Sequence, residues 1–301
     1  MFIYCLVNKG YEKLLKEEVS FRYPQLRISF SRLGFVTFKS QTHISNIDLI
    51  YSRVTGTFIG KYTKDDLDKF ISENEKNSLI HNYDLNSDTA DGQTAKTGDK
   101  ITDIIKVNDN EFWVGERVVT DYTWRCSAGL PVIVLPEESP SRAYLKLEDM
   151  FLWSGYKYKP GLTAIELGSA PGGVSYALLK RGFKVVGVDS GDMDDICLNN
   201  PGFKFLKMSV RDIRKKFIGP DVDILFCDLN LKPVESIPQI RYLSHIYPSI
   251  KRVFYTLKVG EGIPIETILA YIDQFRAMGY KIYATHLPAN RMEICVAGFR
   301  E

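Results

Sequence analysis

A glycine-rich segment between two apolar runs has the residue types of a ligand-binding turn. The first run breaks at Gly168, a Gly/Pro turn follows, and the second run ends on Asp189. Glycines let a backbone approach a ligand closely, and an acid about 20 residues further on can accept the hydroxyls of a ribose. We therefore predict a site for a nucleoside-like cofactor. The residues expected around it are Glu166, Gly168, Ser169, Ala170, Pro171, Gly172, Gly173 and Asp189.

The spacing of these glycines differs from two phosphate-binding turns. Neither G-x-G-x-x-G nor G-x-x-x-x-G-K-[ST] occurs in the segment, which disfavours pyrophosphate and triphosphate ligands. The pattern is instead an acid, Glu166, followed by x-Gly-x-x-Pro-Gly-Gly. Taken alone, it also fits a strand-to-helix turn in another kind of α/β protein.

Four charged residues form a second candidate set. Asp228 and Lys258 each follow an apolar strand-like run, so we expect both at the carboxyl edge of a sheet, where open α/β folds bind ligands. Lys146 lies on a predicted helix ahead of the glycine turn, and Glu293 begins the last predicted strand. Any one of them could be a structural ion pair or a solvated charge. The four together, in this order, favour a catalytic set.

These motifs resemble those of S-adenosylmethionine-dependent methyltransferases, in particular the FtsJ-like RNA ribose 2′-O-methyltransferases. The Pro-Gly-Gly turn is similar to their first motif, and Lys146, Asp228, Lys258 and Glu293 resemble their Lys-Asp-Lys-Glu tetrad. The Asp-Leu-Asn-Leu-Lys-Pro segment at 228–233 is most similar to the RlmM-like branch, which modifies large-subunit ribosomal RNA.

The resemblance implies S-adenosylmethionine as cofactor and RNA, above all large-subunit ribosomal RNA, as substrate. Asp228 would then also border the cofactor. Ser209 stands where the family usually has an acid near the adenine amino group, and Asp212 is close enough in sequence to substitute.

Transfer to a ribose hydroxyl requires removal of its proton, which we assign to Lys258, with both carboxylates orienting its ammonium and that of Lys146. In a milder version, the tetrad only positions the reacting groups.

Other functions stay open on the sequence. A non-catalytic RNA-binding or ribosome-assembly factor can have the same fold, and transfer RNA or a messenger cap can be the methylated substrate. A small-molecule O-methyltransferase would more often use a metal or a histidine base, and the four histidines form no cluster.

Composition limits the remaining properties. The 301 residues are 45% hydrophobic and leave room for about two domains. A net charge of only +2 means that RNA contacts must come from local basic patches, for which 211–216 is one candidate. Five scattered cysteines predict neither a zinc site nor disulfides and favour a reducing, cytoplasmic location. We expect a monomer with no metal and no membrane contact.

The predicted elements divide the chain into three segments. Residues 1–80 show the β-α-β-β-α-β order of a ferredoxin-like α+β module, with a helix expected over 43–53. Residues 81–138 are expected to hold a loop or linker over 82–100 and a short THUMP-like or β-rich segment that docks RNA. Residues 139–301 alternate strands and helices, which predicts an α/β, Rossmann-like domain, and the family resemblance implies that this domain is the methyltransferase. Its parallel sheet should be closed by one antiparallel strand.

Overall fold

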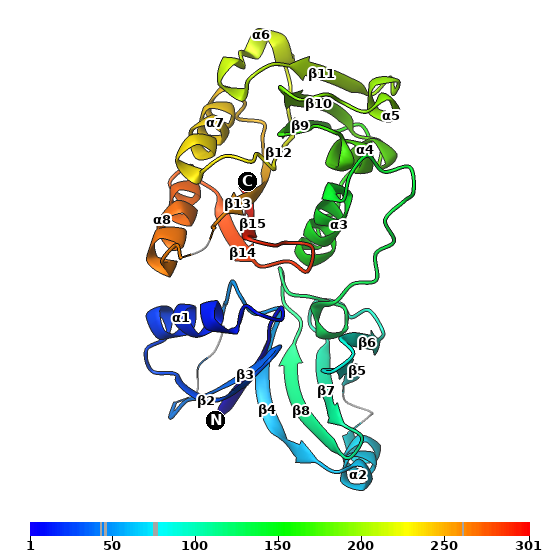
Figure 1. Cartoon of the computed structure of the whole chain (residues 1–301), viewed down its shortest axis with the longest axis vertical. Helices are drawn as coiled ribbons and strands as arrows, with labels where there is room; N and C mark the ends of the chain where they lie inside the picture. Colours follow the sequence, from blue (N-terminus) through cyan, green and yellow to red (C-terminus); the bar gives the residue numbers. More distant parts are fainter. Residues whose placement is uncertain (43, 45–46, 75–77, 261) are drawn as a thin grey trace. The chain divides into compact units, whose positions relative to one another are not determined.

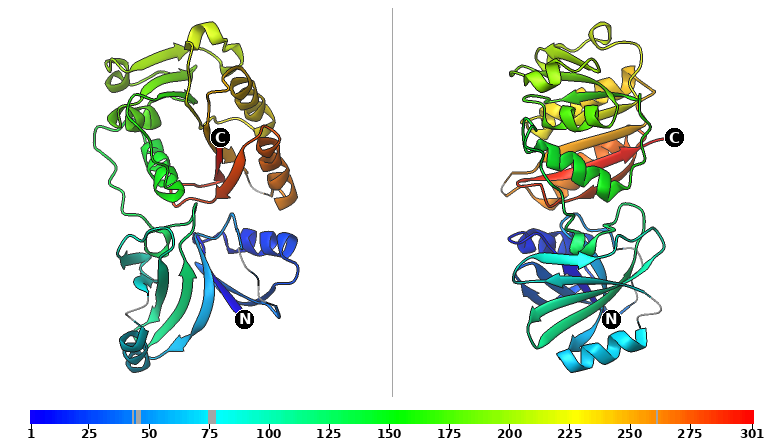
Figure 2. Two further views of the ribbon diagram at one scale, coloured as in Figure 1. Left: turned by 180° about the vertical axis from the view of Figure 1, so that it is seen from behind. Right: turned by 90° about the vertical axis from the view of Figure 1, so that its right-hand side faces the viewer.

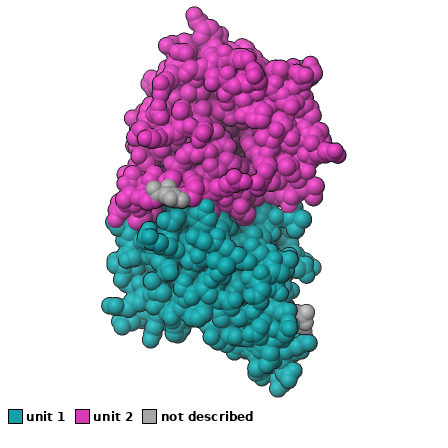
Figure 3. Space-filling model, viewed as in Figure 1, with its two compact units in different colours: residues 1–132, 152–155 teal, residues 133–151, 156–301 magenta. Residues whose placement is uncertain are grey.

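The protein is represented by a computed structural model that describes residues 1–301 except 43, 45–46, 75–77 and 261. The chain forms two compact units, residues 1–132 with 152–155 and residues 133–151 with 156–301 (Figure 3). Each unit is built on its own β-sheet (Figure 1).

The first unit has an eight-stranded sheet in the order β2-β3-β1-β4-β8-β7-β5-β6. Neighbouring strands are antiparallel except β5 and β7, which are parallel. The strands are β1 (Phe2–Leu6), β2 (Arg27–Arg32), β3 (Phe35–Lys39), β4 (Val54–Tyr62), β5 (Leu79–Asp84), β6 (Thr89–Gly92), β7 (Lys100–Asn108) and β8 (Glu111–Val118). The helical segments are α1 (Glu12–Arg22), α2 (Lys64–Asn74) and the short η1 (Ser127–Gly129).

The helix predicted over 43–53 is wrong in the part that can be checked. Residues 43, 45 and 46 lie outside the described residues, and the described residues 47–53 contain no helix. The buried carboxylate of Glu18, on α1, holds this segment instead by accepting the backbone N–H groups of Ile50 (2.8 Å) and Tyr51 (3.1 Å). The apolar residues that suggested a helix therefore belong to a buried irregular segment.

The loop predicted over 82–100 is wrong in part, because residues 85–88 and 93–99 lie outside strands but residues 82–84, 89–92 and 100 do not. β5 continues to Asp84, β6 follows as its antiparallel partner, and β7 begins at Lys100. β6 is an edge strand with mostly exposed residues, so its sequence lacks the apolar alternation of a half-buried strand. The predicted boundary at residue 80 falls inside β5, and strands from both sides of it share one sheet.

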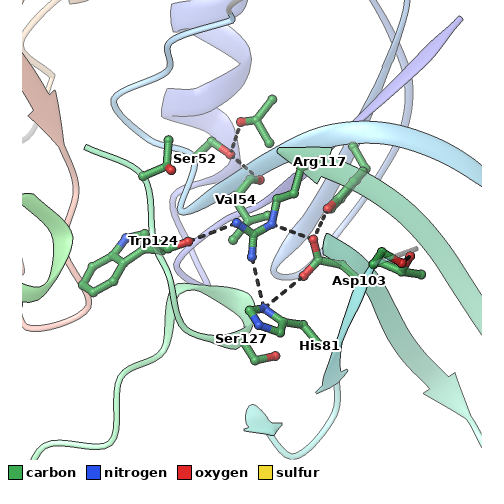
Figure 4. Close-up of polar contacts among 12 residues, drawn as sticks. Ser52, Val54, His81, Asp103, Arg117, Trp124 and Ser127 are labelled. Carbon is green, nitrogen blue, oxygen red and sulfur yellow. Dashed lines mark hydrogen bonds and ion pairs between the residues drawn. The ribbon is translucent and has the colours of Figure 1, made fainter. Parts of the chain in front are cut away.

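A buried polar cluster joins four strands of this sheet (Figure 4). On β8, Arg117 Nε donates to Asp103 Oδ2 on β7 at 2.7 Å, and the Tyr4 hydroxyl on β1 donates to the same oxygen at 2.5 Å. Arg117 Nη2 lies 3.2 Å from His81 Nδ1 on β5. Burial is the largest influence on His81 and lowers its pKa, so its neutral ring accepts this hydrogen bond.

The second unit has a seven-stranded sheet in the order β11-β10-β9-β12-β13-β15-β14. β15 runs antiparallel to both of its neighbours, and the five strands from β11 to β13 are parallel. The strands are β9 (Thr163–Leu167), β10 (Lys184–Asp189), β11 (Phe203–Lys207), β12 (Ile224–Cys227), β13 (Arg252–Lys258), β14 (Lys281–Thr285) and β15 (Glu293–Phe299). This arrangement confirms the predicted Rossmann-like α/β fold with its antiparallel closing strand.

Helices cover both faces of this sheet. In Figures 1 and 2, α3 (Ala143–Ser154) and α4 (Gly173–Lys180) lie on one face, and α7 (Pro233–Ile246) and α8 (Ile265–Arg276) lie on the other. The short segments α5 (Asp195–Leu198), η2 (Val210–Asp212) and α6 (Lys215–Ile218) occur in the connections. Among the residues that the structure describes, no helix has both the length and the apolar character to cross a membrane.

The strand order reverses between β9 and β12. From β9 the chain adds β10 and β11 on one side, and β12 then pairs with β9 on the other side. In open α/β sheets, such a reversal leaves a ligand crevice at the carboxyl ends of the two strands. Gly168 follows β9 there and Asp228 follows β12, with Asp228 N donating to Leu167 O at 2.9 Å.

Candidate active site

The turn after β9 has no room for side chains at its glycines. Gly168 has a φ of +82°, and a Cβ there would lie 2.7 Å from the backbone oxygen of Asp228. Gly172 has a φ of +124°, and its Cβ would lie 2.7 Å from Cys197 Sγ. Both positions therefore need glycine for conformation and for space. Because these positions have no side chains, the backbone of the turn is left bare at both of them.

Polar groups beside this turn could hold a nucleoside-like ligand. Asp189, at the end of β10, accepts the N–H groups of Ala170 at 3.1 Å and Gly191 at 2.8 Å, one on each carboxylate oxygen. Each oxygen still has capacity to accept a further bond. Ser169 Oγ is buried and has no hydrogen-bond partner among the described residues. Because buried hydroxyls are normally satisfied, this orphan group fits a site that binds a polar ligand.

Glu166 lies beneath the turn. Its side chain is 2% exposed and accepts a 2.5 Å hydrogen bond from Ser175 Oγ on α4. Burial is the main influence and raises the pKa of Glu166 well above its ordinary value. The geometry gives this carboxyl group the task of tying β9 to α4.

The remaining predicted cofactor residues lie around the same edge. Ser209 and Asp212 are both exposed, at the two ends of η2, and Met208 N donates to Asp189 O at 2.9 Å. Pro171 O accepts the N–H of Asp194 at 3.0 Å. Gly173 begins α4, where a Cβ would clash with Ser141. The carboxyl ends of β9, β10 and β11 thus lie at one edge of the sheet, because the three strands are parallel neighbours.

The four charged residues form a closed ring. Lys146 Nζ lies 2.9 Å from Asp228 Oδ2 and 2.5 Å from Glu293 Oε1. Lys258 Nζ lies 2.8 Å from Asp228 Oδ1 and 2.7 Å from Glu293 Oε2. Each lysine thus contacts both carboxylates, and cations alternate with anions around the ring. No sequence spacing could show this closure.

Strand register explains how the ring assembles. Lys258 is the last residue of β13 and pairs with Glu293, the first residue of β15, because these strands are antiparallel. Asp228 directly follows β12, the other neighbour of β13. Lys146 comes from α3, on one face of the sheet. The carboxyl edge of the parallel strands therefore also receives the amino end of the antiparallel strand.

The ring favours its charged forms. Burial has the largest influence on Asp228 and would raise its pKa, but Lys258 and Lys146 outweigh it, and the pKa is lowered. Burial likewise would lower the pKa of Lys258, but Asp228 and Glu293 outweigh it, and the pKa is raised. At neutral pH, Lys258 is therefore an ammonium and Asp228 a carboxylate.

Residues 140–265 match the family model of the FtsJ-like methyltransferases. The chain carries an FtsJ-like methyltransferase domain. The match spans Lys146, Asp228, Lys258 and the glycine turn, and it ends before β15 and Glu293. Over these residues, the match confirms the FtsJ-like methyltransferases as the predicted family and, with it, S-adenosylmethionine as the class of cofactor.

Several curated relatives of this methyltransferase domain have the name Ribosomal RNA large subunit methyltransferase M. The protein from Halorhodospira halophila is 28% identical over 172 residues, covering 56% of this chain and 50% of the relative. The protein from Laribacter hongkongensis is 39% identical over 111 residues, covering 35% of this chain and 31% of the relative. The alignments thus span about half the length of these relatives or less. The solved structure of TrmN from Thermus thermophilus covers 99% of both chains, with 13% identity and a TM-score of 0.36.

The sequence did not predict that residues 193–197 pack against the glycine turn after β9. Met193 and Cys197 pack with Tyr176 of α4 in one buried cluster, and Cys197 Sγ lies 3.5 Å from Gly172 O. No motif marks this segment. Its only signal was that a turn rich in glycine must be shaped by neighbouring side chains, because it has few of its own.

Proposed function

We propose that this protein transfers a methyl group from S-adenosylmethionine to a ribose 2′-hydroxyl of RNA, with large-subunit ribosomal RNA as substrate. The observation that carries the proposal is the closed Lys-Asp-Lys-Glu ring at the end of β12 and β13, beside the turn that follows β9. The name shared by the curated relatives supports ribosomal RNA as the substrate class.

The residues at the crevice fit the cofactor. Asp189 would accept the ribose hydroxyls, the Ser169 hydroxyl would gain the partner that it lacks, and Ser209 with Asp212 would face the adenine. When bound, S-adenosylmethionine supplies a methyl group on a positively charged sulfur. Gly168 adds no side chain next to the backbone of Asp228, so it would leave this edge open to the cofactor.

We assign the tetrad the task of holding the hydroxyl and accepting its proton. Lys258 Nζ accepts that proton only in its free amine form, which is a small fraction at neutral pH because its pKa is raised. Asp228 and Glu293 fix the direction of the amine and stabilise the ammonium that results. In the milder version, the ring only positions the hydroxyl, and proximity supplies the rate enhancement.

We assign RNA docking to the first unit. Phe30 on β2 is 43% exposed, and Lys61 Nζ on β4 lies 5.7 Å from its ring centroid. Arg32 Cζ lies 5.7 Å from the ring centroid of Trp113, which packs edge-on against Phe30. Trp113 itself is buried, whereas Phe30 is an exposed aromatic ring beside cations, an arrangement that suits an unpaired RNA base and its phosphate.

The test is methyl transfer from labelled S-adenosylmethionine to total RNA, separated by size and digested to nucleosides. We expect label in a 2′-O-methylated nucleoside from the large ribosomal RNA. Lys258→Ala should reduce it by about 10²- to 10⁴-fold, the range for loss of a general base. Lys184→Ala, an exposed lysine at the start of β10, is the matched control. Cofactor binding without any RNA labelling would favour a non-catalytic assembly factor, and near wild-type turnover of Lys258→Ala would refute its role as base.

A further inference from the structure

A pocket of about 410 Å³ opens beside the tetrad. Its lining includes Lys146 and Glu293 of the ring and two arginines, Arg142 and Arg291. Both arginines are exposed residues. The mechanism proposed above uses neither of them, so the pocket and its arginines need an explanation of their own.

Both arginines line the pocket together with a member of the tetrad. Arg142 directly precedes α3, four residues before Lys146, and both residues line the pocket. Arg291 lies two residues before Glu293, the first residue of β15, and both residues line the pocket. Each arginine is therefore placed next to one member of the ring.

The loop that carries Arg291 is fixed before any ligand arrives. Asp149 Oδ2 on α3 accepts the N–H of Ala289 at 2.8 Å. His286 Nε2 lies 2.9 Å from Arg291 O, and Asn290 Oδ1 accepts the N–H of Leu287 at 3.0 Å. These contacts anchor the loop to α3 and to itself, so Arg291 is held on a preorganised support.

Charge indicates what the pocket binds. Of the charged residues that line the pocket, three are cationic (Arg142, Lys146 and Arg291) and one, Glu293, is anionic. Within the described residues, the Arg142 guanidinium makes no hydrogen bond or ion pair. Guanidinium groups match phosphate oxygens in geometry and charge. In RNA, the 2′-hydroxyl and the 3′-phosphodiester sit on adjacent carbons of the same ribose.

We infer that Arg142 and Arg291 bind a phosphodiester next to the ribose whose 2′-hydroxyl lies at the tetrad. The inference rests on the proposed function and deepens it, because it makes the substrate a polynucleotide chain rather than a nucleoside or a small alcohol. The two arginines set the position of the backbone, and the tetrad then meets only the hydroxyl adjacent to that phosphate.

The test uses the whole 301-residue chain with Arg142→Gln, Arg291→Gln and the double variant. Arg241→Gln, an exposed arginine on α7, is the control. We expect each single change to raise KM for ribosomal RNA about tenfold, the loss expected for one charge-assisted contact, with kcat changed less than threefold. Arg142→Lys should recover part of the loss. Affinity for a fluorescent 20-nucleotide single-stranded RNA should fall in parallel, and its salt dependence should become shallower.

The outcomes separate this inference from the proposed function. If wild type methylates RNA and the double variant matches it in KM and salt dependence, the phosphate site is wrong and the proposed function stands. If wild type methylates no RNA but the double variant still loses affinity for the 20-nucleotide probe, the phosphate site survives. A large fall in kcat at unchanged KM would overturn the inference, because it would place the arginines in the chemical step.

Discussion

Lys258 and Glu293 face each other in the register between β13 and β15, and their side chains extend that backbone pairing into an ion pair of 2.7 Å. The same lysine contacts Asp228 at 2.8 Å, and the two carboxylates together raise its pKa despite its burial. The resting ring therefore stores the proposed base in its protonated form. Activity should depend on how easily that proton leaves.

Glu293→Gln should lower the pKa of Lys258, because it removes one of the two carboxylates that raise it. If Lys258 is the base, wild-type kcat should rise about tenfold per pH unit between pH 7 and 9, as the amine fraction grows. In Glu293→Gln, the rise of kcat with pH should begin at a lower pH than in wild type. The measurement is single-turnover methyl transfer from pH 6.5 to 10, with Glu266→Gln, an exposed acid on α8, as control. Flat profiles for wild type and variant would support the milder version, in which the ring only positions the hydroxyl.

The sequence predicted those parts of the site that depend on local pattern. Asp228 and Lys258 could be placed because each follows an apolar strand, and Gly168 because a tight turn needs its conformation. The closed ring could not be predicted, since it depends on the register of β13 with β15 and on where α3 lies. Likewise, the apolar residues near Ile50 have the spacing of a helix. The local sequence cannot show that the distant Glu18 accepts a hydrogen bond from their backbone.

Gly168→Ala should destabilise the protein and weaken cofactor binding. A Cβ at this position meets both a positive φ and the backbone oxygen of Asp228, so we expect a loss of roughly 2–4 kcal/mol of unfolding free energy. Gly279→Ala is the matched control, because its φ is +85° but no atom lies within 4 Å of the added Cβ. It should cost about 1 kcal/mol and leave cofactor binding unchanged. Urea unfolding and calorimetric titration with S-adenosylmethionine measure both effects, and equal losses in the two variants would contradict the steric argument.

Arg117→Met should leave the Asp103 carboxylate buried without its cation. The two side chains are 6% and 3% exposed, so we expect a loss of about 3–5 kcal/mol of unfolding free energy. Adding Asp103→Leu to this variant should restore part of the stability, because the uncompensated charge is then gone. Lys13→Met, which removes an exposed ion pair with Glu17, should cost less than about 1 kcal/mol. Urea denaturation of the four proteins tests the prediction, and a double variant less stable than Arg117→Met would refute it.

Asp149→Asn should change how stability depends on pH. Burial raises the pKa of Asp149 to about 7, so the folded state holds a proton that the unfolded state releases near pH 4. Wild type should therefore lose stability as pH rises from about 4 to 7, by roughly 2–4 kcal/mol from this group. The asparagine keeps an oxygen to accept the Ala289 N–H and should remove that loss. Thermal unfolding should show that the variant is more stable relative to wild type at pH 8 than at pH 4. An equal gain in stability at both pH values would rule out the carboxyl group as the cause.

The position of β15 has a consequence for biosynthesis. β14 is made before β15 but touches the sheet only through it, and the ring lacks Glu293 until β15 has been translated. A nascent chain that has emerged only as far as β14 therefore has a cofactor turn, an unpaired strand and an open edge on β13. Premature termination before residue 293 would yield a product able to hold the cofactor but unable to complete the ring, and its exposed strand edges would make it a target for aggregation and proteolysis. Quality control of this protein should thus depend on whether β15 has been translated.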